Sequence, residues 1–448
     1  MTYNDVCRKI RRENTMRKST KFISAVVALA STLAFTACGS TGASDGPVEL
    51  SIWGGVQADQ GFNKVIEGFE KKNPNVKVKY TRFTNDPTGN AKLDTALMAD
   101  DSIDMFFTYT PADFERRAKS GIPLDLSTVD SSGLVDKVKD FNLAYEGKYY
   151  GIPTSMESFS IVYNKDKLDE MGITIPDDWT WDDFMEIAKK ATHEENGKTV
   201  YGLAGVWHNI EKQIYGGDAE YTKDGAPNFS DKGWTIKKNY YDMVYKQKSA
   251  YPFSQVMARK IFNYESQLLL TGDALMAFYS PWMSRSALNN VEQYPRNFKL
   301  AFAPLPKINM EGVHSGEYNT EANNWLQISS KSKHPQEAYK FIEYVLTDGA
   351  EDYTKMGKLP VLDGQVSDDA MVSAVLSDKA DTLYDVDSFK KEVLGMDQRY
   401  IISTQFKGRG SLTTIETEEE QNYYLNSKNF DQYIASLTKR FEDELAKN

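Results

Sequence analysis

The chain has 448 residues, with 64 acidic against 53 basic side chains and a formal net charge of −11. Such a chain is a poor candidate for binding nucleic acid or other polyanions, because that affinity rests on Lys and Arg neutralising phosphates. With 40% hydrophobic and 26% charged residues the composition is that of a globular protein, and the length predicts two or three domains.

The first 37 residues have the order of a secretory signal, a basic segment followed by an apolar one. Seven Lys and Arg lie within the first 21 residues, and the run 22–37 carries no charge. Sixteen residues make about 24 Å of helix, shorter than the roughly 30 Å hydrocarbon core, which favours a cleaved signal over a membrane span. Removing the seven basic and two acidic residues of this segment changes the net charge from −11 to −16.

The end of this segment, Phe35-Thr36-Ala37-Cys38-Gly39, resembles a bacterial lipobox, with Phe35 where the motif usually has Leu. The resemblance implies that Cys38 is lipidated and becomes the mature N-terminus, so that residues 1–37 form a lipoprotein signal peptide. The small and polar residues 38–47 that follow are typical of a flexible tether. Met16 is an alternative start to Met1.

The next residues predict a β-α-β-α-β order. A strand at 48–53 precedes an amphipathic helix from Phe62 that Pro74 stops, and an alternating strand follows at 76–80. A helix near 91–98 and a buried strand at 103–107 complete the series. This order favours an α/β fold with a mostly parallel sheet covered by helices.

Further along, a strand is predicted within 158–168, and a helix at 180–191 with Thr180 or Asp178 as its cap. The segment 268–282 reads as a helix ended by Gly272 and then a strand, and 334–349 as a helix that begins at Pro335. We expect Trp179, Trp181 and Trp234 to pack in the core, and the acidic run 416–420 to form a solvated face.

Familiar motifs of cofactor, metal and catalytic sites are incomplete. The four His have no metal-ligand spacing and the only Cys are Cys7 and Cys38, so no metal site is predicted. Gly197-Lys198-Thr199 lacks the leading glycine of a phosphate loop, because Thr192 stands there. The string 42–46 fits G-x-S-x-G but lies in the predicted tether. No cofactor is predicted.

Six segments, in order, resemble the extracellular solute-binding proteins, family 1, of ABC importers, the group that includes maltose-binding protein. They are "LSIWG…FNKVIEGFEKKNPNVKVKY", "YYGIPTSMESFSIVYNKDKLDEMGI", "PDDWTWDDF", "LTGDALMAFYSPW", "APLP" and "NNWLQISSKSKHPQEAYKFIEYV". The resemblance implies a type II periplasmic-binding-protein-like α/β fold, with two lobes, a hinge and a ligand cleft. We expect crossings near 151–158, 312–320 and 356–364. Lobe 1 is then 48–155 with a return segment at 316–358, and lobe 2 is 156–315 with 359–448.

A sugar ring has a face of C–H bonds and a rim of hydroxyls, so its site needs an aromatic platform beside polar groups. Trp282 stands where the family has its ligand-stacking tryptophan, with Tyr279 nearby, and Glu157 stands where the family has a carboxylate that accepts sugar hydroxyls. Other candidates follow strands or lie at a crossing, as ligand-facing residues of open α/β sheets do. These are Trp53, Gln57, Tyr109, Trp207, Asn323, Asn324 and Trp325.

The resemblance implies a monomeric substrate-binding lipoprotein on the outer face of the cell membrane. It captures an oligosaccharide and delivers it to the permease subunits of an ABC importer, without catalysis. Two alternatives stay open: a surface-anchored glycoside hydrolase, and the same fold binding a non-sugar solute such as a peptide or polyamine. The sugar, its linkage and the permease are not specified by the sequence.

Overall fold

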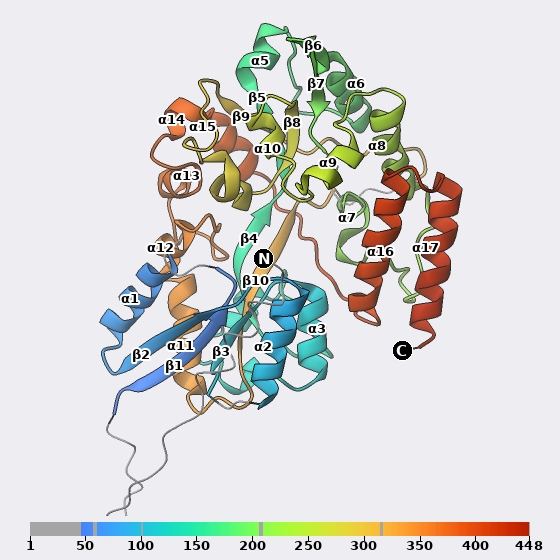
Figure 1. Cartoon of the computed structure of the whole chain (residues 1–448). Helices are drawn as coiled ribbons and strands as arrows, with labels where there is room; N and C mark the ends of the chain where they lie inside the picture. The colour runs from blue at the N-terminus through green and yellow to red at the C-terminus, as the bar shows by residue number, and fades with distance from the viewer. Residues whose placement is uncertain (1–45, 57–60, 100–101, 206–208, 314–316, 448) are drawn as a thin grey trace, which may run out of the picture. The chain divides into compact units, whose positions relative to one another are not determined.

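The computed structural model describes residues 46–56, 61–99, 102–205, 209–313 and 317–447 (Figure 1). Gly46–Asn448 form one compact unit. The predicted signal peptide, Cys38 and most of the predicted tether lie outside the described residues, and so do Gln57 and Trp207. Within the described part, no helix combines the length and apolarity needed to cross a bilayer.

The first sheet has five strands in the order β2-β1-β3-β10-β4. Their bounds are β1 Val48–Gly54, β2 Val76–Arg82, β3 Met105–Thr108, β4 Ile152–Ser158 and β10 Thr320–Ile328. β1 runs parallel to β2 and β3, as the predicted β-α-β-α-β order requires, whereas β10 is antiparallel to β3 and β4. The accompanying helices are α1 Phe62–Lys72, α2 Pro87–Ala99, α3 Pro111–Lys119, α4 Leu134–Val138 and α11 Pro335–Leu346.

The second sheet has the order β6-β7-β8-β5-β9. Its strands are β5 Ser160–Asn164, β6 His193–Glu195, β7 Lys198–Leu203, β8 Ala274–Tyr279 and β9 Leu300–Ala303. Helix α6, Trp181–Ala191, begins with a capping box in which Thr180 and Asp183 exchange hydrogen bonds, so Thr180 is the cap. Other helices of this part are α5 Lys165–Glu170, α7 Lys212–Tyr215, α8 Thr235–Tyr245, α9 Phe253–Arg259 and α10 Gln267–Leu270.

The chain passes between the two sheets by short connections. Phe159 alone separates β4 from β5, and residues 304–319 lead from β9 back to β10. After α12, Ala350–Thr354, the chain continues to α13, Asp368–Leu376, which contacts the helical turns 284–288 and 390–394 beside the second sheet. Two short helices, α14 Ala380–Leu383 and α15 Val386–Phe389, follow. The result is the predicted α/β fold, but the expectation of a mostly parallel sheet is wrong, because β10, β5 and β6 pair antiparallel with their neighbours.

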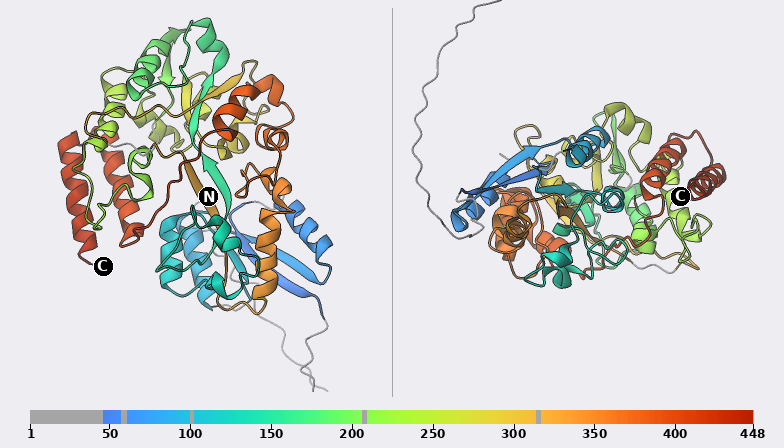
Figure 2. Two further views of the ribbon diagram at one scale, coloured as in Figure 1. Left: turned by 180° about the vertical axis from the view of Figure 1, so that it is seen from behind. Right: turned by 90° about the horizontal axis from the view of Figure 1, so that it is seen from below.

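Two long helices, α16 Arg409–Tyr424 and α17 Phe430–Leu445, end the described chain and lie side by side (Figures 1 and 2). The prediction of a solvated acidic face at 416–420 is wrong, because Glu416, Glu419 and Glu420 are buried. Helix α16 packs on α17 and on α8. Arg440 of α17 and Lys428, which precedes α17, pair with Glu419, and Lys237 of α8 pairs with Glu420.

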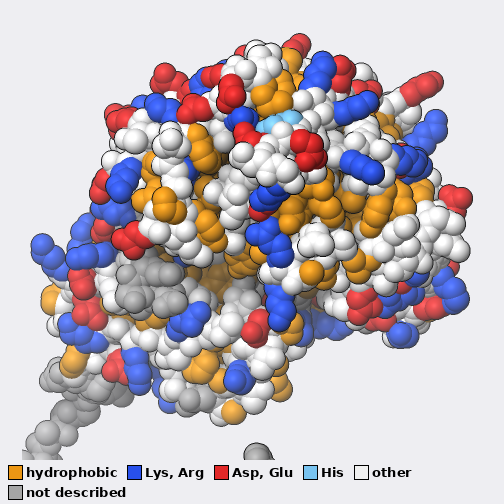
Figure 3. Space-filling model, turned by 45° about the horizontal axis from the view of Figure 1, so that its top comes forward, with side chains coloured by type: hydrophobic (Ala, Val, Ile, Leu, Met, Phe, Trp, Pro, Cys, Tyr) orange, Lys and Arg blue, Asp and Glu red, His pale blue; other side chains and the backbone are white. Residues whose placement is uncertain are grey.

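The tryptophans assigned to the core are buried, with 1% of Trp179, 3% of Trp181 and 1% of Trp234 exposed. Trp179 also donates a hydrogen bond from Nε1 to the carbonyl of Pro304, 3.0 Å away. On the face drawn in Figure 3, acidic and basic side chains are interspersed among apolar ones, so that neither sign of charge dominates it. This mixed surface gives no footprint for a polyanion.

Candidate functional site

A pocket of about 310 Å³ lies where β8 ends, and we call it the Trp282 pocket. Trp282 follows β8 after Ser280 and Pro281, and its ring is partly exposed. The edge of Tyr264 meets it, with ring centroids 5.7 Å apart and planes at 87°. Asn209, Asn263, Glu265, Ser266 and Ser280 supply polar groups, and Phe159, Gly205, Ala277, Phe278, Tyr279 and Met283 complete the lining.

A larger hollow of about 650 Å³, the groove, adjoins this pocket, since Asn209 lines both. One wall comes from the part of the chain around the first sheet and includes Asn85, Asp86, Asn90, Asp94, Tyr109, Thr110, Asp113, Arg116, Glu321, Asn323 and Trp325. The other comes from the segment after β7 and from α16, and includes Asn209, Lys212, Glu220, Arg409, Thr413, Thr414 and Glu416. Pocket and groove lie within the roughly 300–1,000 Å³ typical of small-molecule sites.

Five of the residues predicted from the sequence line these hollows: Trp282 and Tyr279 in the Trp282 pocket, and Tyr109, Asn323 and Trp325 in the groove. Two of them contribute little open surface. Only 1% of Tyr279 is exposed, with its hydroxyl 2.8 Å from Ser284 Oγ, and only 2% of Trp325, whose Nε1 donates to Asn142 Oδ1 at 3.1 Å.

Tyr109 stacks on Phe107, with ring centroids 6.1 Å apart, and its hydroxyl accepts a hydrogen bond from the Gly55 N–H at 2.6 Å. Burial raises the pKa of this hydroxyl, which therefore stays protonated and keeps a hydrogen to donate. Tyr109 thus gives the groove an aromatic edge held in place by the loop after β1.

Trp53, Asn324 and Glu157 line neither hollow. Trp53 lies on β1 and packs on the small apolar cluster of Phe83, Leu93, Leu97, Ile103 and Phe106. Asn324 is 3% exposed and donates from Nδ2 to Ser155 Oγ. The alternation of β10 explains this placement, because Glu321, Asn323 and Trp325 share one side of the strand and Asn324 lies on the other.

Glu157 lies at the end of β4, beside the chain crossing, and is 5% exposed. Its Oε2 accepts a hydrogen bond from Ser280 Oγ at 2.5 Å, and its Oε1 lies 4.0 Å from Lys358 Nζ. Burial raises the pKa of Glu157 and lowers that of Lys358, each partly opposed by the charge of the other. Glu157 therefore connects β4, β8 and the segment after α12 in the interior.

Several polar residues of the groove are not predicted from the sequence. Glu321 is one for which a signal exists, since it precedes Asn323 by two positions on the same strand. Burial raises its pKa, and Lys212 and Arg409 oppose this. For Lys212 burial acts to lower the pKa, but Glu321 and Glu220 raise it overall, so the lysine stays charged. Lys212 and Arg409 come from separate segments, and no local pattern places them together.

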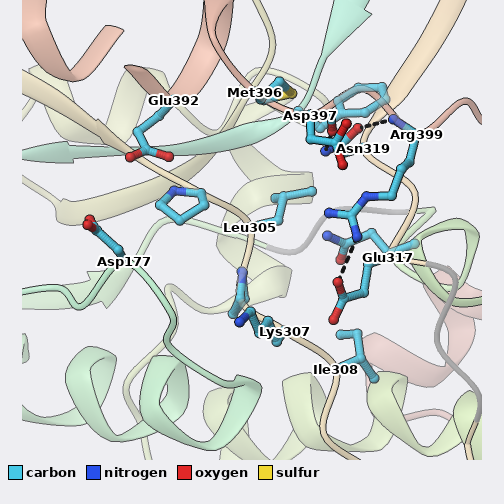
Figure 4. A pocket seen from close by; sticks show the side chains of 14 residues that line it. Asp177, Leu305, Lys307, Ile308, Glu317, Asn319, Glu392, Met396, Asp397 and Arg399 are labelled. Atoms are coloured by element: carbon cyan, nitrogen blue, oxygen red, sulfur yellow. Dashed lines mark hydrogen bonds and ion pairs between the residues drawn. The ribbon is translucent and has the colours of Figure 1, made fainter. Parts of the chain in front are cut away.

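A third hollow, of about 210 Å³, lies where the connections between the sheets meet, and we call it the crossing cavity (Figure 4). Its lining comes from residues 304–308 and from Phe159, Asp177, Gln213, Glu317, Asn319, Glu392, Met396, Asp397 and Arg399. Arg399 donates to Glu317 at 2.8 Å and its N–H to Asn319 Oδ1 at 2.9 Å, as drawn in Figure 4. This cavity is smaller, and Arg399, Glu317 and Asn319 are engaged with each other, so the Trp282 pocket with the groove is the better candidate site.

Comparison with known proteins identifies the family of the chain. The family model described as bacterial extracellular solute-binding protein matches residues 53–352, more than half of the chain. The multiple sugar-binding protein of Streptococcus mutans is 26% identical over 309 residues, which cover 65% of this chain and 69% of that protein.

Two solved structures share the fold. One is a sugar transporter from Rhizobium etli in an open conformation, with a TM-score of 0.68, 18% identity, and coverage of 88% of this chain and 99% of that one. The other is an ABC substrate-binding protein from Listeria monocytogenes in complex with cycloalternan, with a TM-score of 0.66, 18% identity, and coverage of 89% and 98%. These likenesses confirm the two-lobe α/β architecture.

Proposed function

The chain belongs to the bacterial extracellular solute-binding proteins, and from this premise we propose that it captures an oligosaccharide for an ABC importer. The observation that carries the proposal is the partly exposed Trp282 in a pocket with asparagine, serine and carboxylate groups, directly beside a longer polar groove. An aromatic face suits the C–H surface of a sugar, and the surrounding amides and carboxylates suit its hydroxyls.

The adjoining hollows support a chain of sugar units rather than a single ring. The Trp282 pocket holds one aromatic platform, and the groove beyond Asn209 offers Tyr109, Asn323 and Glu321. We expect a terminal unit to stack on Trp282 and further units to extend into the groove. The sugar-binding name of the Streptococcus mutans relative agrees with this ligand class.

The remaining parts of the proposal concern place and partners. The family is extracellular, so the protein acts outside the cytoplasm. We propose that Cys38 carries a lipid anchor and that the monomeric protein passes its ligand, unchanged, to the permease subunits. A micromolar dissociation constant, about −8 kcal/mol, is strong enough for capture and weak enough for release.

The test is isothermal titration of the chain from Gly39 onward, which contains the whole compact unit, against di- to hexasaccharides. Spermidine and a mixed peptide digest serve as control ligands, and each sugar is analysed for cleavage afterwards. Saturable binding of an uncut oligosaccharide supports the proposal. A shortened sugar would indicate a glycoside hydrolase, and heat only from a control ligand would indicate a non-sugar solute.

The Trp282 platform is tested by two substitutions. Trp282→Ala should weaken binding at least about tenfold, because it removes an anchoring aromatic surface. Trp282→Phe keeps a ring and should retain most of the affinity. Equal affinity of Trp282→Ala and the unchanged protein would contradict the placement of the sugar, even if binding itself is observed.

A further inference from the structure

Three buried carboxylates converge where α16 meets the segment after β7. Glu211 precedes α7, Glu220 lies shortly after it, and Glu416 is on α16. One oxygen from each lies within 4.8 Å of the other two. Only 0%, 7% and 6% of these side chains are exposed, in the same order. We call these three residues the carboxylate cluster.

A fourth glutamate and a lysine border the cluster. Glu420 lies one turn beyond Glu416 and is 4% exposed. Lys237 Nζ, fully buried, is 2.8 Å from Glu211 Oε2, 3.0 Å from Glu420 Oε1 and 3.8 Å from Glu416 Oε1. One cation therefore faces three carboxylates on this side.

On the opposite side of the cluster, the positive charges do not balance the negative ones either. Arg409 Nη1 lies 3.9 Å from Glu220 Oε2, but the same guanidinium donates to Asp218 Oδ1 at 2.7 Å. Lys212 interacts with Glu220, and also with Glu321 across the groove. Negative charge thus exceeds positive charge around the cluster, in an interior where an unbalanced carboxylate is costly.

Further polar groups around the cluster are without hydrogen-bond partners. No described residue donates a hydrogen bond to Glu220 Oε2, to Glu416 Oε1 or to Glu211 Oε1, whereas Glu211 Oε2 is paired with Lys237. Tyr433 on α17 is fully buried, and its hydroxyl likewise has no partner among the described residues. Burial raises the pKa of this hydroxyl. The charge of Lys237 opposes this rise, and the charges of Glu420, Glu416 and Glu211 add to it.

The cluster is also reachable from solvent, since Glu220 and Glu416 line the groove. An ion that enters the groove meets two of the three carboxylates at its wall. Convergent oxygens, an excess of negative charge, unpartnered acceptors and an entry path are the features of a cation site.

We propose that Glu211, Glu220 and Glu416 bind a divalent cation of the Ca²⁺ class. Carboxylate oxygens within 4.8 Å of one another can ligate a single ion. A buried set of three protein carboxylates favours Ca²⁺ over Mg²⁺, because Mg²⁺ dehydrates reluctantly and usually keeps several of its waters. The all-oxygen donor set suits a hard cation rather than zinc. The cation joins α16 to the segment that carries Asn209 and Lys212, and thereby fixes one wall of the groove.

The test uses the purified protein, treated with EDTA and freed of chelator, without sugar. Isothermal titration with CaCl₂ should show one saturable site, and the melting temperature should rise by at least about 3 °C at saturating Ca²⁺. MgCl₂ at the same concentration should give a smaller rise. Because neither readout involves a sugar, a negative result here leaves the proposed sugar binding untouched.

Two carboxylate-to-amide variants of α16 form a matched pair. Glu416→Gln should lose the Ca²⁺-dependent rise in melting temperature, whereas Glu418→Gln, at an exposed position of the same helix, should keep it. Glu416→Gln removes a buried negative charge, so in EDTA it should melt at or above the temperature of the unchanged protein, which shows that it folds. Absence of Ca²⁺ binding at millimolar concentration, or an equal response of both variants, would overturn the proposal.

Discussion

Glu157 stays a predicted ligand residue, and the structure adds what its carboxylate contacts. The sequence resemblance places it against a sugar, yet its carboxylate is buried between Ser280 and Lys358. The residue lies near the end of β4, one short connection before β5 of the second sheet. The burial of its carboxylate involves Lys358, about 200 residues further along the chain. No local sequence pattern reveals that pairing.

The pKa of Glu157 leads to a pH prediction. Its folded-state pKa is raised above the ordinary 4.5, so above pH 4.5 the folded chain holds more protons than the unfolded chain. The contribution of Glu157 to the free energy of unfolding is therefore largest below pH 4.5 and falls as the pH rises through the raised value. Urea titrations from pH 4.5 to 7.5 should show a steeper fall for the unchanged protein than for Glu157→Gln.

Lys358→Met is the companion variant. The pKa of Lys358 is lowered in the folded chain, so this lysine adds stability as the pH rises from that lowered value toward 10.5. Lys358→Met should lose this gain in the free energy of unfolding at alkaline pH. The fall in that free energy between pH 4.5 and 7.5 should stay largely unchanged. Identical pH profiles for the unchanged protein and both variants would mean that the pair carries no coupled charge.

At the scale of elements, the sequence predicts well wherever a local signal sets the boundary. The Thr180 cap, Pro335 at the first turn of α11 and Gly272 with φ +66° after α10 lie as predicted. The order of the first elements does not predict the antiparallel strand β10, because β10 enters the first sheet only after the chain has formed the second one. The local pattern also does not reveal that Glu416 is buried, because the nearby cation, Lys237, comes from α8.

Thr180 gives a test at the start of α6. Thr180→Ala removes both of its side-chain hydrogen bonds in the capping box and should lower the free energy of unfolding by about 1 kcal/mol. Thr180→Ser keeps the hydroxyl and should recover most of the loss. The measurement is urea denaturation of the three proteins, and a Ser variant as unstable as the Ala variant would speak against the cap.

Gly217 tests how the groove wall is held. A Cβ at Gly217 would lie 2.3 Å from the backbone carbon of Ile402, and the Gly217 carbonyl accepts from Ser403 Oγ at 3.0 Å and Arg409 Nη1 at 3.2 Å. Gly217→Ala should therefore destabilise the protein by about 1–3 kcal/mol. Gly410→Ala, with no atom closer than 4.0 Å, is the control and should cost little, as measured by thermal unfolding.

At the scale of the whole molecule, charge and ligand class make a further prediction. The net charge is strongly negative, yet a neutral sugar has no charge for salt to screen. The dissociation constant for an oligosaccharide should therefore change less than about twofold between 50 and 500 mM NaCl, by isothermal titration. A constant that weakens tenfold or more over this range would point to a cationic ligand instead.

Phe159, the single residue between β4 and β5, lines both the Trp282 pocket and the crossing cavity. One residue thus lines both hollows, so a movement of Phe159 on one side alters the space on the other. The sequence has no cysteine after Cys38, so a thiol introduced at Met396 in the crossing cavity would be the only labelling position in residues 46–448. A dye attached there would respond to movement of Phe159 without occupying the Trp282 pocket. The chain is therefore a natural scaffold for a reagentless optical sensor of its own ligand.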